Sequence, residues 1–389
     1  MECQPPKYKA EDEEEALPEY SLECTVEESF HRDSRKAQTL SLEFKENIVD
    51  LAFGLGDIVR GKLCVCPLDE DIVSQGIGIE VILYECYKGK LVHQTTVCNY
   101  VIPLEAYPEN LRFCYGYTYR FPFSMLIPIH LSDGSLLPPS FNESNLYYVR
   151  ARLVKDNNRI IEAYEDIVVI PAYGGEELGV GNEKEIFRTC KQLECSAGLF
   201  KKAKYGLLAL EIPGPLVFIV SSWNASLVPV RVHFDPVEKR HQHLPPEIHT
   251  ISYKLRSHTT VSGNQVKTIL QQQQIDFEKL QWNIPKPDGY FEALAQLPIT
   301  LPFGDLSYIP TFYSKLTSRT YSIEVTVTTK NHGDITLAAP VVILYDPLRV
   351  HEFPRTKRDD SKIPKAIRLP HAPNPTSIDS MVMSSVLRS

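Results

Sequence analysis

The fold of this chain is decided by the stretch Tyr119-Arg-Phe-Pro-Phe-Ser-Met-Leu-Ile-Pro128, followed by Leu137-Pro-Pro-Ser-Phe141 and Tyr147-Tyr-Val-Arg-Ala-Arg-Leu153. Prolines interrupt its apolar runs, and the last run alternates. Four residues of that run share one face of a strand: Tyr147, Val149, Ala151 and Leu153. Because proline is confined to strand starts, edges and turns, the pattern predicts edge and corner strands of an antiparallel β-sandwich.

The rest of the chain is also typical of an all-β protein. Strand-like alternation recurs over Ile77–Leu83 and Tyr321–Val327, and no segment has the apolar periodicity of a long amphipathic helix. The 29 prolines, 20 tyrosines and 16 phenylalanines favour strands and turns. A length of 389 residues predicts two domains, since single cores stop growing near ~250–300 residues.

The opening pattern has an echo later in the sequence. The first copy consists of Ile127-Pro-Ile-His-Leu131, Pro138-Pro-Ser-Phe141 and the strand from Tyr147. The second copy consists of Leu297-Pro-Ile-Thr-Leu-Pro302, Ile309-Pro-Thr-Phe312 and the strand from Tyr321. A chance echo is the alternative. Matched pieces in the same order, about 171 residues apart, instead favour two tandem antiparallel, immunoglobulin-like β-sandwich domains.

Charge and composition divide the chain further. Residues 1–30 hold ten acids and two lysines, so they account for the formal net charge of −8. The sequence therefore predicts an acidic disordered arm and no basic stripe for nucleic acid. The expected organisation is this arm (1–30), an N-terminal domain (31–172), a linker (173–192), a C-terminal domain (193–346) and a disordered tail (347–389).

Neither a metal site nor a cofactor site is expected. The nine cysteines contain only one close pair, Cys64 and Cys66, which are interpreted as buried free thiols and not zinc ligands. His241 and His243 could bind a metal together with Asp235 or Glu238, but a loop with two exposed histidines is favoured. No secretory signal or membrane-spanning helix is evident, and the expectation is a cytoplasmic protein.

Several of these segments resemble the arrestin family. Five segments resemble its N-terminal domain: the turn from Gly56-Asp57 to Gly61, the strand Ile77-Gly-Ile-Glu-Val81, Phe121-Pro-Phe123, Leu137-Pro-Pro-Ser-Phe141 and Tyr148. Two further segments resemble the end of its C-terminal domain: Leu297-Pro298 and Pro310-Thr-Phe312. The resemblance covers roughly residues 35–346 and is closest to the α-arrestins, the arrestin-related trafficking adaptors of fungi and animals. It implies a non-enzymatic binding scaffold with two arrestin-like sandwiches.

Arrestin-related adaptors recruit HECT-type ubiquitin ligases through PPxY motifs read by WW domains, and this chain contains Pro5-Pro6-Lys7-Tyr8. Two prolines favour polyproline II geometry, and a tyrosine can fill a second pocket of an aromatic groove. A Pro-rich segment with an incidental tyrosine is the alternative. In α-arrestins such motifs usually lie in the C-terminal tail, and here the tail has none.

A related motif, Leu17-Pro18-Glu19-Tyr20, lies twelve residues further along. It is interpreted either as a second, weaker WW ligand or as the lead-in to the first strand, with Tyr20 packed on the domain. Two motifs on one arm would raise the effective concentration for a ligase with several WW domains.

The resemblance implies an adaptor that links cytosolic regions of plasma-membrane transporters or receptors to the ligase, for ubiquitylation and endocytosis. The expected location is cytoplasmic with recruitment to the plasma membrane or endosomes. Basic residues between Arg355 and Arg368 suggest peripheral contact with an anionic bilayer, against a solvated tail as the alternative. A trafficking or signalling scaffold that works without a ligase is the second functional hypothesis, and catalytic residues are not expected.

Overall fold

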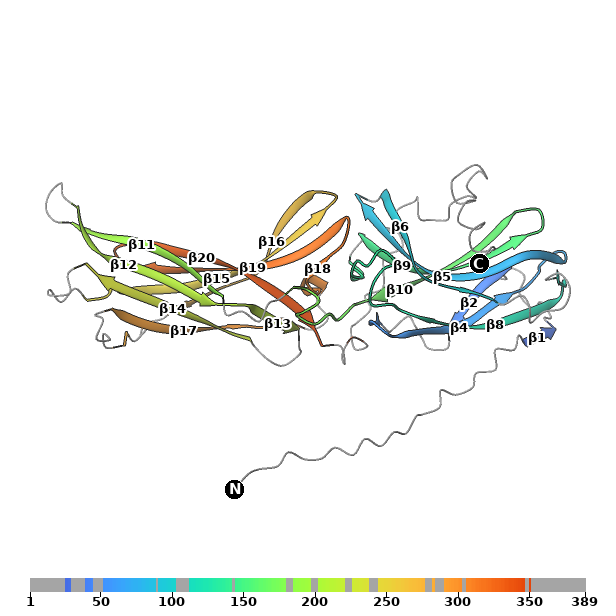
Figure 1. The fold of residues 1–389 in the computed structure, drawn as a ribbon, viewed down its shortest axis with the longest axis horizontal. Helices are drawn as coiled ribbons and strands as arrows, with labels where there is room; N and C mark the ends of the chain where they lie inside the picture. The colour runs from blue at the N-terminus through green and yellow to red at the C-terminus, as the bar shows by residue number, and fades with distance from the viewer. Residues whose placement is uncertain are drawn as a thin grey trace, which may run out of the picture.

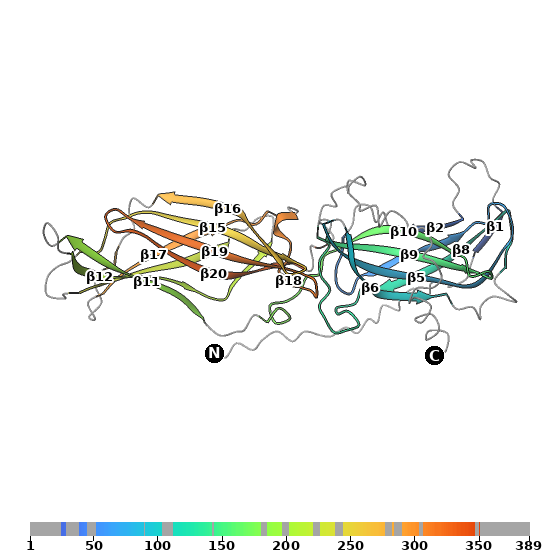
Figure 2. The ribbon, with the colours of Figure 1, turned by 90° about the horizontal axis from the view of Figure 1, so that it is seen from above.

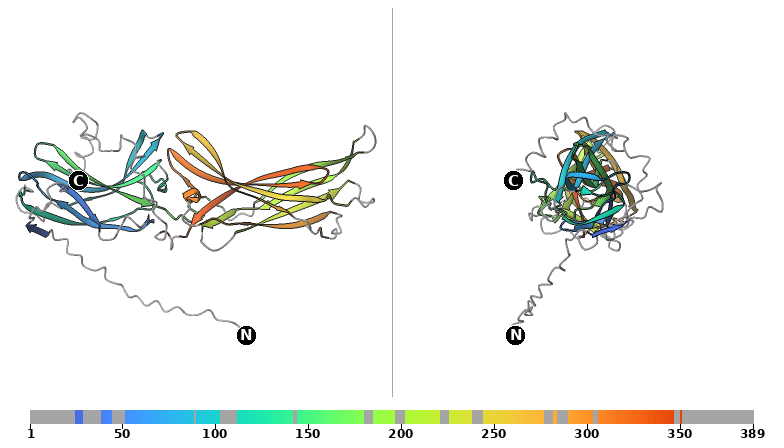
Figure 3. Two further views of the ribbon diagram at one scale, coloured as in Figure 1. Left: turned by 180° about the vertical axis from the view of Figure 1, so that it is seen from behind. Right: turned by 90° about the vertical axis from the view of Figure 1, so that its right-hand side faces the viewer.

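The computed structural model describes residues 25–28, 39–44, 52–88, 90–102, 112–141, 144–179, 185–196, 202–220, 226–237, 244–276, 282–283, 290–302, 306–346 and 350. The described residues form strands, turns and one short 3-10 helix, so the expectation of an all-β fold is confirmed. The molecule is elongated, with a first half (residues 25–179) and a second half (residues 185–350) placed end to end (Figure 1). The view from behind shows the same arrangement, and in the view along the long axis the two halves overlap (Figure 3).

The first half is built from two sheets. Its strands are β1 (Thr25–Glu28), β2 (Leu40–Phe44), β3 (Ala52–Phe53), β4 (Ile58–Val65), β5 (Ile72–Tyr87), β6 (Lys90–Val101), β7 (Arg112–Phe113), β8 (Tyr117–Leu126), β9 (Asn145–Lys155) and β10 (Ile160–Val169). One sheet has the order β1-β8-β4-β2, and the other has the order β3-β10-β9-β5-β6, with β7 paired to β5. Strands β5, β9 and β10 lie above β4 and β8 in Figure 1.

The second half also contains a four-stranded and a six-stranded sheet. Its elements are β11 (Ile186–Ser196), β12 (Lys202–Pro213), β13 (Leu216–Val220), β14 (Ser226–Pro236), β15 (Ile248–Val261), β16 (Asn264–Asp276), β17 (Phe291–Ile299), the 3-10 helix η2 (Leu306–Tyr308), β18 (Phe312–Tyr313), β19 (Thr317–Thr329) and β20 (Gly333–Tyr345). The sheet orders are β11-β12-β14-β17 and β13-β20-β19-β15-β16, with β18 paired to β19.

The two halves share one strand order. The path β3-β10-β9-β5-β6 corresponds to β13-β20-β19-β15-β16, and in each path the first pair is parallel and the other pairs are antiparallel. The path β8-β4-β2 corresponds likewise to β17-β14-β12. The halves differ in the strand that precedes each repeat, because β1 lies beside β8 whereas β11 lies beside β12. In Figure 2 the six-stranded sheets of both halves are seen from above.

The alternating runs predicted from the sequence bury their apolar sides between the sheets. Tyr147, Val149, Ala151 and Leu153 of β9 belong to the core of the first half together with Ile77, Ile79, Val81 and Leu83 of β5. Tyr321, Ile323, Val325 and Val327 of β19 belong to the core of the second half. Strands β5, β9 and β19 therefore alternate over these runs as the sequence predicts, with every second residue in a core.

Two tyrosines at the start of matching strands anchor the proline-rich segments that precede them. The hydroxyl of Tyr147, on β9, donates a hydrogen bond to the carbonyl of Pro138. The hydroxyl of Tyr321, on β19, donates to the carbonyl of Ile309 at 2.6 Å. Burial raises the pKa of Tyr321 to about 12, so the donor proton is retained at neutral pH. The sequence echo thus corresponds to a repeated side-chain anchor.

Three details differ from the sequence-based expectations. Thr25–Glu28, inside the segment expected to be disordered, form β1, because the edge of β8 offers backbone partners that need little apolar side chain. Residues 186–192 of the expected linker belong to β11, which pairs with β12. The run from Tyr147, expected at an edge or corner, is the central strand β9, which lies between β10 and β5.

The tyrosine anchor gives a stability prediction. Tyr147→Phe keeps the buried ring but leaves the carbonyl of Pro138 without this donor, so the free energy of unfolding should fall by about 1–3 kcal/mol. Urea denaturation measures the change. Tyr313→Phe, at a tyrosine that is 52% exposed, is the control and should change stability by less than about 0.5 kcal/mol. Equal effects at the two positions would contradict the anchor.

Candidate functional site

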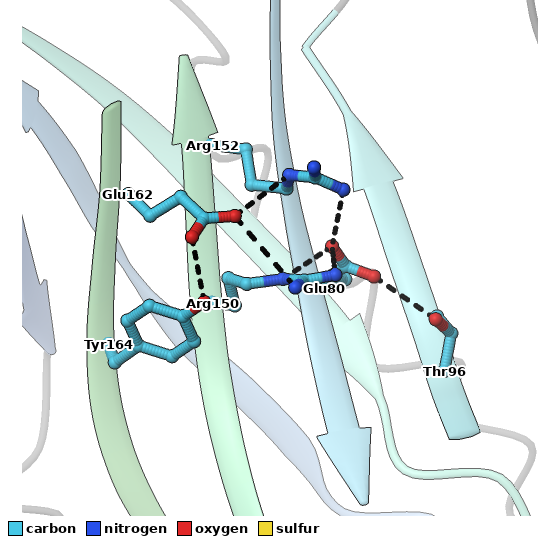
Figure 4. A network of polar contacts seen from close by, with 6 residues as sticks. All are labelled: Glu80, Thr96, Arg150, Arg152, Glu162 and Tyr164. Atoms are coloured by element: carbon cyan, nitrogen blue, oxygen red, sulfur yellow. Dashed lines mark hydrogen bonds and ion pairs between the residues drawn. The ribbon is translucent and has the colours of Figure 1, made fainter. Parts of the chain in front are cut away.

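A network of charged side chains lies on the outer face of the six-stranded sheet of the first half (Figure 4). Glu80 lies on β5 between two core residues, Ile79 and Val81, so its side chain points to the opposite face. The strand register sets Glu80 opposite Arg150 on β9, and Glu162 on β10 opposite Arg152. Cross-strand pairing alone therefore brings two acids and two arginines together.

The contacts in this network are short and shared. Glu80 Oε1 lies 2.6 Å from Arg150 Nη2 and 3.9 Å from Arg152 Nη1, and its other oxygen accepts a hydrogen bond from the Thr96 hydroxyl at 3.1 Å. Glu162 Oε1 lies 3.1 Å from Arg152 Nε and 3.8 Å from Arg150 Nη1. The Tyr164 hydroxyl donates to Glu162 Oε2 at 2.9 Å. Each carboxylate thus contacts both guanidinium groups.

The network is largely removed from water, with Arg150 only 9% exposed. Burial alone would lower the pKa of the Arg150 guanidinium, but Glu80 and Tyr164 together outweigh that effect and raise it. Burial and the nearby Glu162 carboxylate raise the pKa of Tyr164, which therefore stays protonated and can donate. The network pairs two carboxylates with two guanidinium groups, so its formal charges balance.

An apolar cluster continues the same outer face. It consists of Ile82, Tyr84, Cys86, Leu146 and Tyr148 with Tyr164 packed against them, and it is separate from the core between the sheets. The rings of Tyr84 and Tyr148 lie 5.6 Å apart, and those of Tyr148 and Tyr164 lie 6.4 Å apart. Strands β5 and β9 are therefore buried on both faces, which makes this part of the molecule a stiff platform.

The corresponding strands of the second half carry a smaller network with the charges exchanged. Arg256 lies on β15 and Glu324 on β19, with 3.0 Å between Arg256 Nη2 and Glu324 Oε1. His258, on β15, contacts the hydroxyl of Ser322 at 2.8 Å. Arg256 and Glu324 are more exposed than Arg150 and Glu80, so the network of the first half is the more deeply buried of the two.

Polar side chains also meet where the two halves touch. The Ser314 hydroxyl of the second half donates to Oε1 of Glu85, a buried carboxylate of the first half, at 2.9 Å. The Thr317 hydroxyl donates to Oδ1 of Asn145 at 3.1 Å, and the amide of Asn145 donates to the Pro139 carbonyl at 3.2 Å. These bonds join the end of β5 and the start of β9 to the second half.

A buried arginine completes this junction. Arg319 is 6% exposed, and its guanidinium carbon lies 4.9 Å from the centre of the Phe141 ring, which belongs to the first half. It donates hydrogen bonds to the Tyr321 hydroxyl at 2.9 Å and to the Ser307 carbonyl at 2.6 Å. In the described part of the chain no carboxylate lies within ion-pair distance of it, so neutral oxygens and aromatic faces hold this charge.

The site residues predicted from the sequence are not among these groups. Pro5, Pro6, Tyr8, Leu17, Pro18 and Tyr20 lie outside the described residues, as do His241 and His243. Burial raises the pKa of Cys64 to about 12, as expected for an interior thiol, whereas Cys66 is only partly buried. Within the described ranges no group of three or more His, Cys, Asp or Glu side chains is placed to hold a metal ion.

Comparison of the whole chain with models of protein families finds no match, and comparison with curated proteins finds none either.

The outer-face network gives a second stability prediction. Glu80→Gln removes the carboxylate closest to buried Arg150, and the free energy of unfolding should fall by about 3 kcal/mol because that charge keeps only the more distant Glu162. Urea denaturation of purified protein measures the loss. Glu247→Gln, in an exposed pair with Lys330, is the matched control and should cost less than about 1 kcal/mol. Similar losses in both variants would mean that the network adds no stability.

Proposed function

We propose that this protein is an arrestin-like adaptor that links cytosolic regions of plasma-membrane transporters or receptors to the WW domains of a HECT-type ubiquitin ligase. The body would consist of two tandem sandwich domains that bind the cargo, and residues preceding β1 would bind the ligase. The protein would then promote cargo ubiquitylation and endocytosis by proximity alone. The protein would be located in the cytoplasm and would be recruited to the plasma membrane or endosomes.

One observation supports the ligase-binding role most directly. The motif Pro5-Pro6-Lys7-Tyr8 precedes a segment, Thr25–Glu28, that pairs with the edge of β8. A WW ligand must be extended when bound, and the motif is tethered to the body through β1. The repeated strand order and the stiff platform of β5 and β9 are consistent with a scaffold.

Binding to isolated WW domains of a HECT ligase tests the proposal. Tyr8→Ala in the full chain should weaken binding by at least tenfold, because the tyrosine fills one of the two pockets of the groove. Fluorescence polarisation or biolayer interferometry measures the affinity. Tyr20→Ala should have a smaller effect, since Leu17 replaces the first proline of the motif. Equal binding by the wild-type chain and Tyr8→Ala would refute the ligase-binding role.

The alternative is an arrestin-like trafficking or signalling scaffold that works without a ligase. Deletion of residues 1–24 separates the two functions while retaining the β1 strand on β8. Cargo uptake in cells that stops after this deletion supports the adaptor, and unchanged uptake supports the alternative.

A further inference from the structure

Strand β17 ends the four-stranded sheet of the second half, along its lower margin in Figure 1. Its counterpart in the first half, β8, has β4 on one side and β1 on the other. β17 has β14 on one side, and the described residues contribute no strand to its other side. The strand that precedes the second repeat, β11, does not pair with β17 in the way that β1 pairs with β8, because it pairs with β12 at the opposite edge of the sheet.

The backbone groups at this edge have a defined direction. The N–H of Asn283 donates to the carbonyl of Glu292 at 2.8 Å, so that carbonyl points away from β14. Because direction alternates along a strand, the backbone groups of Leu294 and Gln296 point the same way. Pro298, at the next outward position, has no N–H to leave unpaired. Two complete backbone donor and acceptor pairs therefore line the edge between Asn283 and Pro298.

The edge strand itself carries no charged side chain over this stretch, although Arg231 of the adjacent strand β14 lies opposite Leu294 and is exposed. No Asp, Glu, Lys or Arg occurs from Ala293 to Ile299. Ala293, Ala295, Leu297 and Ile299 face the core, whereas Leu294 is 53% exposed on the outer face. Leu227, on the adjacent strand β14 and opposite Pro298, is 57% exposed. Exposed apolar side chains beside an open sheet edge are typical of a surface that accepts another strand.

We propose that the β17 edge binds a short extended segment of a partner protein, which pairs antiparallel with Leu294–Pro298 as β1 pairs with β8. The segment would have apolar side chains at alternate positions, because these would lie beside exposed Leu294. It would carry no basic side chain there, because Arg231 of β14 lies opposite Leu294. About four residues of contact bury far less than the ~1,200 Å² of stable protein–protein interfaces, so the binding is reversible. This inference stands independently of the ligase-binding role proposed above.

A second copy of this chain fits the edge poorly. Antiparallel pairing of two β17 strands about Ala295 would set Pro298 of one copy beside Glu292 of the other. Asn283 already lies at that place and bonds to Glu292. A separate short segment can end before it meets Asn283.

Amide hydrogen exchange of the full chain tests the proposal, with the probe peptide acetyl-Lys-Thr-Val-Thr-Val-Thr-Val-Lys-amide. Exchange at the amides of Leu294 and Gln296 should be fast in the free chain and at least tenfold slower with saturating peptide. No slowing at millimolar peptide overturns the proposal. Amides that are already protected in the free chain also overturn it, because the chain itself or a second copy then covers the edge.

Matched variants separate edge pairing from binding elsewhere. Gln296→Pro removes an outward N–H and should weaken peptide binding at least tenfold, whereas Gln296→Ala keeps the N–H and should bind as the wild type does. Leu294→Lys should also weaken binding, and Ile186→Lys, similarly exposed but on β11 at the opposite edge of the sheet, should not. Circular dichroism melting checks that each variant is folded. Wild-type affinity in both Gln296→Pro and Leu294→Lys overturns the proposal.

Discussion

The contact of Phe141 with Arg319 and Phe312 is the constraint on which the arrangement of the two halves depends. Phe141, Ile309 and Phe312 form one small buried cluster, with the rings of Phe141 and Phe312 6.3 Å apart. Arg319 is buried beside them, and a buried cation is costly unless its hydrogen bonds are made. Its acceptors lie in the second half, but the aromatic face of Phe141 comes from the first. Separating the halves would therefore expose an aromatic cluster and remove one wall of the arginine site.

The junction also explains why the echoed segments matter. Phe141 and Phe312 are the matching phenylalanines of the two sequence copies, and Tyr147 and Tyr321 are the matching anchors behind them. The repeats thus meet through the same part of their fold. From this junction the long strands β5 and β9 run into the outer-face platform, and β15 and β19 run into its second-half counterpart. A partner bound on one half would contact a body whose other half is held in place.

Much of the fold follows from the sequence because strand alternation and proline position are local signals. The run from Tyr147 predicts its own buried face, and the echo at Tyr321 predicts a second strand of the same kind. The outer-face network is different. Arg150 and Arg152 alternate with core residues, which marks them as outward-facing, but only the register with β5 and β10 reveals Glu80 and Glu162 as their partners. β1 could not be predicted either, because its pairing depends on the edge of β8, which lies about 90 residues further along the chain.

Three features support the proposed binding role: the platform in the first half, the proposed open edge in the second, and the motif-bearing segment ahead of β1. How these features lie relative to one another depends on the contact between the two halves. A double-mutant cycle between Phe141→Leu and Arg319→Met, read by urea denaturation, tests that dependence most directly. The account predicts a coupling free energy of about 1–2 kcal/mol between the two positions. Additive losses, with a coupling below about 0.3 kcal/mol, would contradict it, because the halves would then be stable without their shared contact.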